Sequence, residues 1–285
     1  MEIQNIGVVG CGLMGSGIAE AFARHGYHVV VREINTQALE AGRTRLRGSM
    51  ERGLARGKLT QDEFDAAWEH LSFTTDLGAM HDRDLVVEAA VENLPLKKEI
   101  FAALDEISPS HAILASNTSS LSIAEMAAAT KRPGQVLGMH FFNPVPVMPL
   151  LELVRGLLTG EETLETARAV GAALDKQVIV ARDTPGFIVN LLLIPYLLDA
   201  IQALERGVGT KEDIDTGVRL GLNHPMGPFT LLDFVGLDTT LFIADAMYEE
   251  FKDSRYAAPP LLRRMVTAGL LGRKSGHGFY DYSQK

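Results

Sequence analysis

A glycine-rich turn near the start of the chain constrains the fold more than any other feature. Gly10-Cys-Gly12-Leu-Met-Gly15 follows a short apolar run and precedes a helical pattern. A G-x-G-x-x-G turn in this context is typical of a dinucleotide-binding βαβ unit, where the glycines let a pyrophosphate approach the helix N-terminus. We expect Gly10, Gly12, Leu13, Met14 and Gly15 to contact the cofactor; the alternative is a glycine turn without a ligand.

Short β-branched runs alternate with helical patterns through the first half of the chain. The runs are Ile6-Gly-Val-Val-Gly10, His28-Val-Val-Val-Arg32, Leu85-Val-Val-Glu88, Ala112-Ile-Leu-Ala115 and Val136-Leu-Gly-Met-His140. This alternation indicates an α/β fold with a Rossmann-type doubly wound, mostly parallel sheet. Two more apolar segments follow at 150–154 and 177–180, and from Asp183-Thr-Pro-Gly186 onward the pattern is helical. We predict a cofactor-binding domain over residues 1–183 and an all-helical C-terminal domain over residues 184–285.

A charge-rich helical stretch interrupts the alternation at about residues 36–71. It is long for a simple crossover, so we expect a helical hairpin outside the sheet. Its basic side chains include Arg52 and Arg56. A docking surface for an anionic ligand and a solvated helix face explain these two residues equally well.

The overall charge limits the partners of the protein. Lys and Arg number 27 against 36 Asp and Glu, a net charge of −9, which argues against nucleic acid or an anionic membrane as the main partner. A single cysteine excludes an internal disulfide and a thiolate metal cluster, and we predict no metal. The sequence has no signal-peptide pattern and no apolar run near the roughly 20 residues that cross a bilayer, so we expect a cytoplasmic protein.

An acidic residue after the second strand indicates which dinucleotide binds. Glu33 lies 18 residues beyond Gly15, where a carboxylate accepts hydrogen bonds from the adenosine ribose and repels a 2′-phosphate. The neighbouring Arg32 offers the opposite preference if its guanidinium turns inward. Consecutive strand residues face opposite ways, so both side chains should not face the ribose. The sequence favours NAD over NADP.

A histidine and a buried-looking carboxylate form the candidate catalytic pair. His140 ends a predicted strand, at the sheet edge where α/β proteins bind ligands, and histidine exchanges protons near neutral pH. Glu152 interrupts the apolar segment 150–154, where a carboxylate is costly unless it is paired. If the two strands are neighbours, Glu152 can orient the imidazole and stabilise the imidazolium. The alternatives are a structural histidine and a partly exposed edge carboxylate.

Several specific stretches give nearly the whole chain a resemblance to one family. These stretches are Gly10-Cys-Gly-Leu-Met-Gly15, Glu88-Ala-Ala-Val-Glu92, Ser116-Asn-Thr-Ser-Ser-Leu121, His140-Phe-Phe-Asn-Pro-Val-Pro146, Pro185-Gly-Phe-Ile-Val-Asn190, Pro225-Met-Gly-Pro228 and Gly276-His-Gly-Phe-Tyr280. With them, the sequence resembles the short-chain L-3-hydroxyacyl-CoA dehydrogenases, and among them especially the bacterial 3-hydroxybutyryl-CoA dehydrogenases.

The resemblance implies an oxidoreductase of fatty-acid metabolism. It implies NAD-dependent oxidation of a short-chain (S)-3-hydroxyacyl-CoA, such as 3-hydroxybutyryl-CoA, to the 3-oxoacyl-CoA, and the reverse reduction. His140 would then be the acid/base and Glu152 its orienting partner, while Ser119 and Asn190 would hold the substrate oxygen. The alternatives are capping of the next helix by Ser119 and a backbone hydrogen bond for Asn190.

The same resemblance assigns further residues to the cofactor and substrate. Glu92, Lys97 and Asn143 would line the nicotinamide half of the site with Ser119, and Lys274 would also reach the cofactor. Solvated loop charges and a turn asparagine are the alternatives. Coenzyme A carries phosphates that the predicted Arg52 and Arg56 surface would bind. The resemblance also implies a homodimer formed through the helical domain.

Three other functions compete with this interpretation. A dehydrogenase of another 3-hydroxy acid, such as gulonate or hydroxyadipyl-CoA, would use the same catalytic pair. A non-catalytic, crystallin-like relative is disfavoured because Ser119, His140, Glu152 and Asn190 occur together. A piece of a multifunctional fatty-acid oxidation protein is the third alternative.

Overall fold

The chain folds into two units whose boundary lies between Thr184 and Pro185. The computed structural model describes residues 3–283. The first unit is built on a sheet and the second is helical. This architecture confirms the predicted Rossmann-type domain followed by a helical domain.

An eight-stranded sheet forms the centre of the first unit, in the order β3-β2-β1-β4-β5-β6-β7-β8. All neighbouring strands are parallel except β6 and β7, which are antiparallel. Because β1, β4, β5 and β6 run in the same direction, their carboxyl ends share one edge of the sheet. The strands are β1 (Asn5–Val9), β2 (His28–Arg32), β3 (Leu71–Thr74), β4 (Leu85–Glu88), β5 (Ile113–Ser116), β6 (Val136–Phe141), β7 (Leu150–Arg155) and β8 (Gln177–Arg182).

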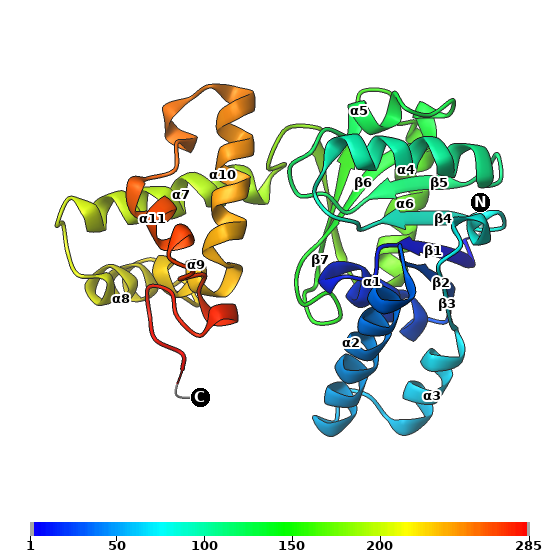
Figure 1. The fold of residues 1–285 in the computed structure, drawn as a ribbon, viewed down its shortest axis with the longest axis horizontal. Coiled ribbons are helices and arrows are strands. Elements are labelled where there is room, and N and C mark those ends of the chain that lie inside the picture. Colours follow the sequence, from blue (N-terminus) through cyan, green and yellow to red (C-terminus); the bar gives the residue numbers. More distant parts are fainter. Residues whose placement is uncertain (1–2, 284–285) are drawn as a thin grey trace. The chain divides into compact units, whose positions relative to one another are not determined.

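Helices cover both faces of this sheet. Figure 1 shows α4 (Leu94–Ile107) and α5 (Ile123–Ala127) on the opposite side of the sheet from α1 (Leu13–Arg24). The apolar side chains of α1 and α6 (Glu161–Ala173) join one buried cluster with strand residues such as Leu85 and Val87. Since strand side chains alternate between faces, Val86 and Glu88 of β4 point to the α4 side.

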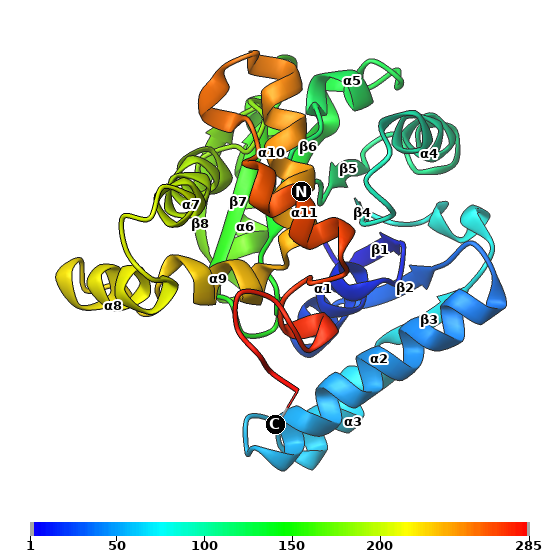
Figure 2. The ribbon, with the colours of Figure 1, turned by 60° about the vertical axis from the view of Figure 1, so that its left-hand side comes forward.

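The chain segment that connects β2 to β3 forms two helices, which lie outside the sheet. Asn35 caps α2 (Thr36–Ala55), and Thr60 and Glu63 form a capping box at the start of α3 (Gln61–Glu69). Figures 1 and 2 show α2 and α3 side by side and extending beyond the sheet.

Over residues 185–283, the second unit is a cluster of five α-helices around its own core. The α7 helix carries Pro195 in its interior, and Figure 1 shows α10 crossing α7. Buried side chains from these helices, including Leu197, Phe229, Ala244 and Leu262, form the core. The helices are α7 (Val189–Glu205), α8 (Lys211–Gly221), α9 (Pro228–Val235), α10 (Leu237–Phe251) and α11 (Pro260–Thr267). Short 3₁₀ helices in the two units span Leu77–Met80, Pro133–Gln135, Ser254–Tyr256 and Arg273–Ser275.

A helix that crosses a bilayer must be both long and apolar. Among residues 3–283, none of the helices combines the length and apolar character that a bilayer span requires.

Candidate active site

The glycine turn joins β1 to α1, and the surroundings of its three glycines differ. Gly10 has φ +98°, and a Cβ there would lie 2.6 Å from the Ala89 carbonyl oxygen. A Cβ on Gly15 would lie 1.8 Å from the Gly10 oxygen, so this glycine permits the helix to pack on the turn. A Cβ on Gly12 would meet no heavy atom within 4 Å. Because the packing of the protein itself does not require a glycine at position 12, that open space fits a ligand that approaches the backbone closely.

The start of α1 suits an anion. Its N-cap is Gly12, and within the described residues no side chain caps this helix start or places an acidic group in its first turn. The backbone N–H groups at a helix N-terminus carry positive potential and bind phosphate oxygens. Leu13, Met14 and Gly15 form the first turn of this helix. The residues present therefore fit a dinucleotide pyrophosphate.

Glu33 lies beside this turn, as a ribose-binding carboxylate requires. Its Oε1 accepts a hydrogen bond from the Cys11 N–H at 2.8 Å, and its Oε2 accepts one from the Ile34 N–H at 2.7 Å. Arg32 turns elsewhere, because its Nε donates to the Thr75 carbonyl at 3.3 Å. Arg45 of α2, which the motif did not single out, donates from Nη1 to the Cys11 carbonyl at 3.0 Å.

His140 and Glu152 face each other across the antiparallel β6–β7 pair. The two residues are directly opposite in the register, and His140 Nδ1 lies 2.9 Å from Glu152 Oε2. The histidine is 6% exposed and the glutamate 0% exposed. A buried carboxylate at this distance holds the proton on Nδ1 in the neutral ring and stabilises the charged ring. The strands are therefore neighbours, which was the condition for this candidate pair.

Glu92 organises the turn that carries Ser119. Its Oε1 accepts hydrogen bonds from Thr118 Oγ1 at 2.8 Å and from the Ser119 N–H at 3.0 Å. Ser119 does not cap the following helix, because the N-cap of α5 is Ser122, whose hydroxyl accepts from the Glu125 N–H. The capping alternative for Ser119 is therefore wrong.

Lys97 lies inside the protein beneath this turn. Its side chain is 1% exposed, and Nζ donates to Glu88 Oε1 at 2.7 Å and Oε2 at 2.9 Å. The ammonium also forms an ion pair with Glu92 Oε2 at 3.1 Å. The structure thus places the Lys97 charge between two carboxylates instead of on a solvated loop.

The other sequence-predicted residues lie at several places on the two units. Asn143 is exposed after β6, and Arg52 and Arg56 are exposed at the end of α2. In the helical unit, Asn190 lies in the first turn of α7 and is 8% exposed. Lys274 Nζ donates to Asp238 Oδ2 of α10 at 2.6 Å.

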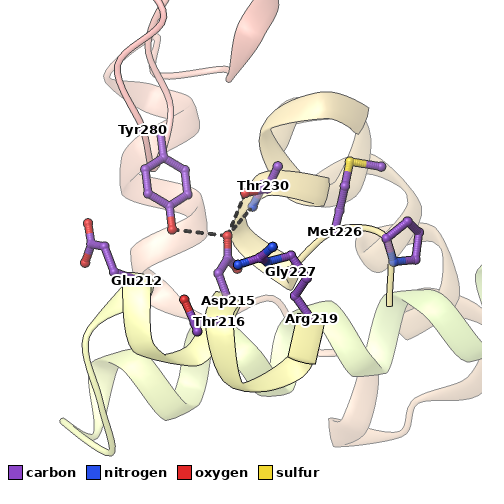
Figure 3. A pocket seen from close by; sticks show the side chains of 9 residues that line it. Glu212, Asp215, Thr216, Arg219, Met226, Gly227, Thr230 and Tyr280 are labelled. Atoms are coloured by element: carbon purple, nitrogen blue, oxygen red, sulfur yellow. Dashed lines mark hydrogen bonds between the residues drawn. The ribbon is translucent and has the colours of Figure 1, made fainter. Parts of the chain in front are cut away.

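A hollow of about 250 Å³ lies in the helical unit. Figure 3 shows side chains that line it, among them Asp215, Thr230 and Tyr280. Asp215 lies at this hollow and accepts hydrogen bonds from the Phe229 and Thr230 N–H groups, Thr230 Oγ1 and the Tyr280 hydroxyl. These bonds satisfy its carboxylate and cap the start of α9. Burial, with the nearby Asp215 carboxylate, raises the pKa of Tyr280 above its usual range. The Asp215 carboxylate at this hollow therefore has a structural role, because it joins α8 to the start of α9.

Metal binding has no support in the part of the chain that the structure describes. Residues 3–283 contain no group of three or more His, Cys, Asp or Glu side chains arranged to hold a metal ion.

A Rossmann-type domain with a phosphate-binding turn and a buried His–Glu pair, followed by a helical domain, is an architecture of NAD-linked oxidoreductases. Residues 5–184 match the family model "3-hydroxyacyl-CoA dehydrogenase, NAD binding domain", and residues 186–282 match the C-terminal domain of the same family. The chain belongs to the 3-hydroxyacyl-CoA dehydrogenase family. This membership confirms the resemblance drawn from the sequence motifs.

Individual relatives agree with the family over the full length of the chain. The 3-hydroxybutyryl-CoA dehydrogenase of Mycobacterium tuberculosis H37Rv is 55% identical over 282 residues, which cover 98% of this chain and 99% of that protein. The crystal structure of M. tuberculosis FadB2 matches with a TM-score of 0.97 at 54% identity, covering 99% of this chain and 100% of that one. The (S)-3-hydroxybutyryl-CoA dehydrogenase of Ralstonia eutropha matches with a TM-score of 0.93 at 43% identity and the same coverage.

Proposed function

We propose that this protein is an NAD-dependent dehydrogenase that interconverts short-chain (S)-3-hydroxyacyl-CoA, such as 3-hydroxybutyryl-CoA, and 3-oxoacyl-CoA. The observation that carries the proposal is the buried His140–Glu152 pair near the carboxyl end of β6. This end lies at the sheet edge that also carries the glycine turn. Family membership and the names of the full-length relatives support the substrate class.

In this proposal, His140 exchanges the proton of the substrate hydroxyl. During oxidation, Nε2 removes the proton from the C3 hydroxyl, while the Nδ1 proton remains hydrogen-bonded to Glu152. NAD, held by the glycine turn and Glu33, would supply the hydride acceptor for oxidation and, in its reduced form, the hydride donor for reduction. In the reduction direction, the His140 imidazolium returns its proton to the C3 oxygen, so the proton and the hydride balance in both directions.

Ser119 and Asn190 hold the substrate oxygen in the same proposal. Both side chains supply hydrogen-bond donors. The Ser119 backbone is already fixed by Glu92, which leaves little conformational freedom to lose when a ligand binds. Asn190 is a buried amide in the apolar first part of α7, where a polar group requires partners.

The cofactor contacts follow the elements at the carboxyl edge of the sheet. The α1 N-terminus would bind the pyrophosphate, and Glu33 would bind the adenosine ribose. Glu92, Lys97 and Asn143 would line the nicotinamide half, with Lys97 acting through its two carboxylate partners. Lys274, whose ammonium is paired with Asp238, is assigned to the same cofactor.

Two further parts of the proposal concern the coenzyme A moiety and the oligomer. Arg52 and Arg56 are exposed at the end of α2 and would bind coenzyme A phosphates.

A homodimer through the helical unit is supported by exposed apolar side chains there, among them Leu192 at 69%, Leu220 at 68% and Leu222 at 61%. Sedimentation of the native protein and of Leu220→Glu would test the dimer; a native monomer would refute it.

The deciding experiment follows NADH absorbance with acetoacetyl-CoA. The native protein and His140→Ala are compared, and the native protein is also tested with NADPH and with NAD and gulonate. The proposal predicts NADH oxidation that collapses in His140→Ala. Folded native protein that shows no turnover would refute the substrate class, and turnover of gulonate alone would favour the hydroxy-acid alternative.

A further inference from the structure

The sheet contains a buried carboxylate that none of the proposed roles uses. Glu88 ends β4 and is 0% exposed. It accepts two hydrogen bonds from Lys97 Nζ, one from Ser116 Oγ at 2.6 Å and one from the Ala90 N–H at 2.7 Å. In the sheet, Glu88 is in register with Val9 of β1 and Ser116 of β5. It therefore lies directly beside the strand that leads into the phosphate turn.

The interactions of Glu88 continue to the turn that carries Ser119. Lys97 links Glu88 to Glu92, whose Oε1 holds Thr118 Oγ1 and the Ser119 N–H. Thr118 Oγ1 in turn accepts from the Leu121 N–H at 2.9 Å. These charged groups therefore link the backbone of this turn to Glu88. A second, shorter link runs through Ser116 Oγ, which donates to Glu88 and accepts from the Thr118 N–H at 3.3 Å.

Burial makes this chain sensitive to each of its members. Lys97 is 1% exposed, so its ammonium has no access to bulk water that would replace a lost carboxylate. Two carboxylates, those of Glu88 and Glu92, form ion pairs with it. If the Glu88 charge is removed, Glu92 becomes the remaining anion for Lys97, and its hold on Thr118 and Ser119 must change.

We propose that Glu88 is a positioning residue, which acts through Lys97 and Glu92 to fix Ser119 for the substrate and cofactor. This inference rests on the proposed function, because that function gives Ser119 its role. Glu88 itself touches neither ligand in this proposal. Its effect on the reaction arises from geometry, since small displacements of a positioning group cost up to about a hundredfold in rate.

Glu88→Gln tests the proposal with little change of shape. The amide oxygen still accepts from Ala90 and Lys97, and Ser116 Oγ can rotate to accept from the new amide N–H. We expect faster hydrogen–deuterium exchange of residues 117–121 in the cofactor-free protein, together with a fall in kcat/KM of about tenfold or more. If Glu88→Gln fails to fold, Glu88→Asp takes its place, because it keeps the charge but shortens the side chain. We expect Glu88→Asp also to speed the exchange of residues 117–121 and to lower kcat/KM.

Asp105→Asn is the matched control. Asp105 is also a buried carboxylate on the α4 side of the sheet, 7% exposed and bound to Arg132 Nε at 2.7 Å. It lies near the C-terminal end of α4, away from the Glu88 chain of contacts. We expect this variant to lower Tm without changing exchange at residues 117–121 or kcat/KM.

A double-mutant cycle separates the proposed route from general destabilisation. If Glu88 acts through Glu92, Glu88→Gln should add little to the effect of Glu92→Gln. Independent, multiplying effects would overturn the proposal, as would a Glu88→Gln variant that behaves like Asp105→Asn. The exchange measurement needs no substrate, so it tests the chain of contacts even if the native protein fails to turn over acetoacetyl-CoA.

Discussion

Replacing Glu152 by glutamine perturbs the proposed catalytic pair with almost no change of volume. Unit charges 2.9 Å apart, as on Glu152 Oε2 and His140 Nδ1, attract by about 6 kcal/mol at an effective dielectric constant near 20. This energy corresponds to about 10⁴-fold in rate at about 1.4 kcal/mol per tenfold. The glutamine amide can also donate to Nδ1, which would place the ring proton on Nε2, the wrong tautomer for a base. We expect kcat to fall about 10³- to 10⁴-fold.

The assay is kcat for acetoacetyl-CoA reduction by NADH, with KM and Tm measured in parallel. The loss should appear in kcat, because Glu152 acts on the charge of the ring and not on substrate binding. Glu20→Gln makes the same chemical change at another buried carboxylate, 2% exposed on α1, and should keep its kcat. A folded Glu152→Gln protein that retains more than about a tenth of native kcat would refute the proposed charge stabilisation.

Four further predictions test the cofactor turn, its neighbours Glu33 and Cys11, and the capping box of α3. Gly12→Ala should fold normally but bind NAD weakly, as measured by calorimetry. Gly15→Ala should bind NAD weakly and also have a lower Tm, because its Cβ meets the Gly10 oxygen. An equal fall in Tm for the two variants would contradict this prediction. Glu33→Gln should raise the NADPH-to-NADH ratio of kcat/KM about tenfold, and an unchanged ratio would place the ribose elsewhere. Burial and then the Glu33 charge raise the pKa of Cys11 to about 12, so iodoacetamide should alkylate the native thiol slowly at pH 8 and rapidly only after unfolding. Hydrogen bonds from the Thr60 backbone and side chain lower the pKa of Glu63 in the folded protein from 4.5. The stability that the Glu63 carboxylate contributes is therefore present above pH 4.5 and is lost as pH falls through its folded-state pKa. The urea midpoints of the native and Glu63→Gln proteins should converge in acid.

The sequence predicts most of the sheet because its central strands are buried on both faces. Segments such as Leu85-Val-Val87 are continuous apolar runs, which is the pattern of a parallel strand. The edge strand β3 (Leu71–Thr74) lacks that pattern, because its residues are exposed or only partly buried, and the sequence did not predict it. The antiparallel direction of β7 has no local signal, since pairing depends on contacts that are distant in the sequence.

The candidate site also contains residues that the sequence predicts and contacts that it does not predict. A carboxylate inside an apolar strand drew attention to Glu152, and its opposite position to His140 follows from strand register. The same signal is present at Glu88, for which the sequence predicts no role of its own. The contact of Arg45 with the phosphate turn was not predictable, because it depends on how α2 packs against that turn. Gly42 allows α2 to pack closely against the turn, because a Cβ at this position would lie 2.4 Å from Cys11 Sγ.

The buried charges of the sheet unit are difficult to explain by stability. Glu152 and Glu88 are fully buried, and burying an ionised group costs several kcal/mol before its partner compensates. Apolar pairs of similar volume often stabilise a core at least as well. Glu152 instead faces the residue proposed to carry the proton, and Glu88 anchors the turn proposed to hold the substrate oxygen. Their common position, at or near the carboxyl edge of the sheet, therefore points to a site in which positioned charges serve the reaction at the expense of stability.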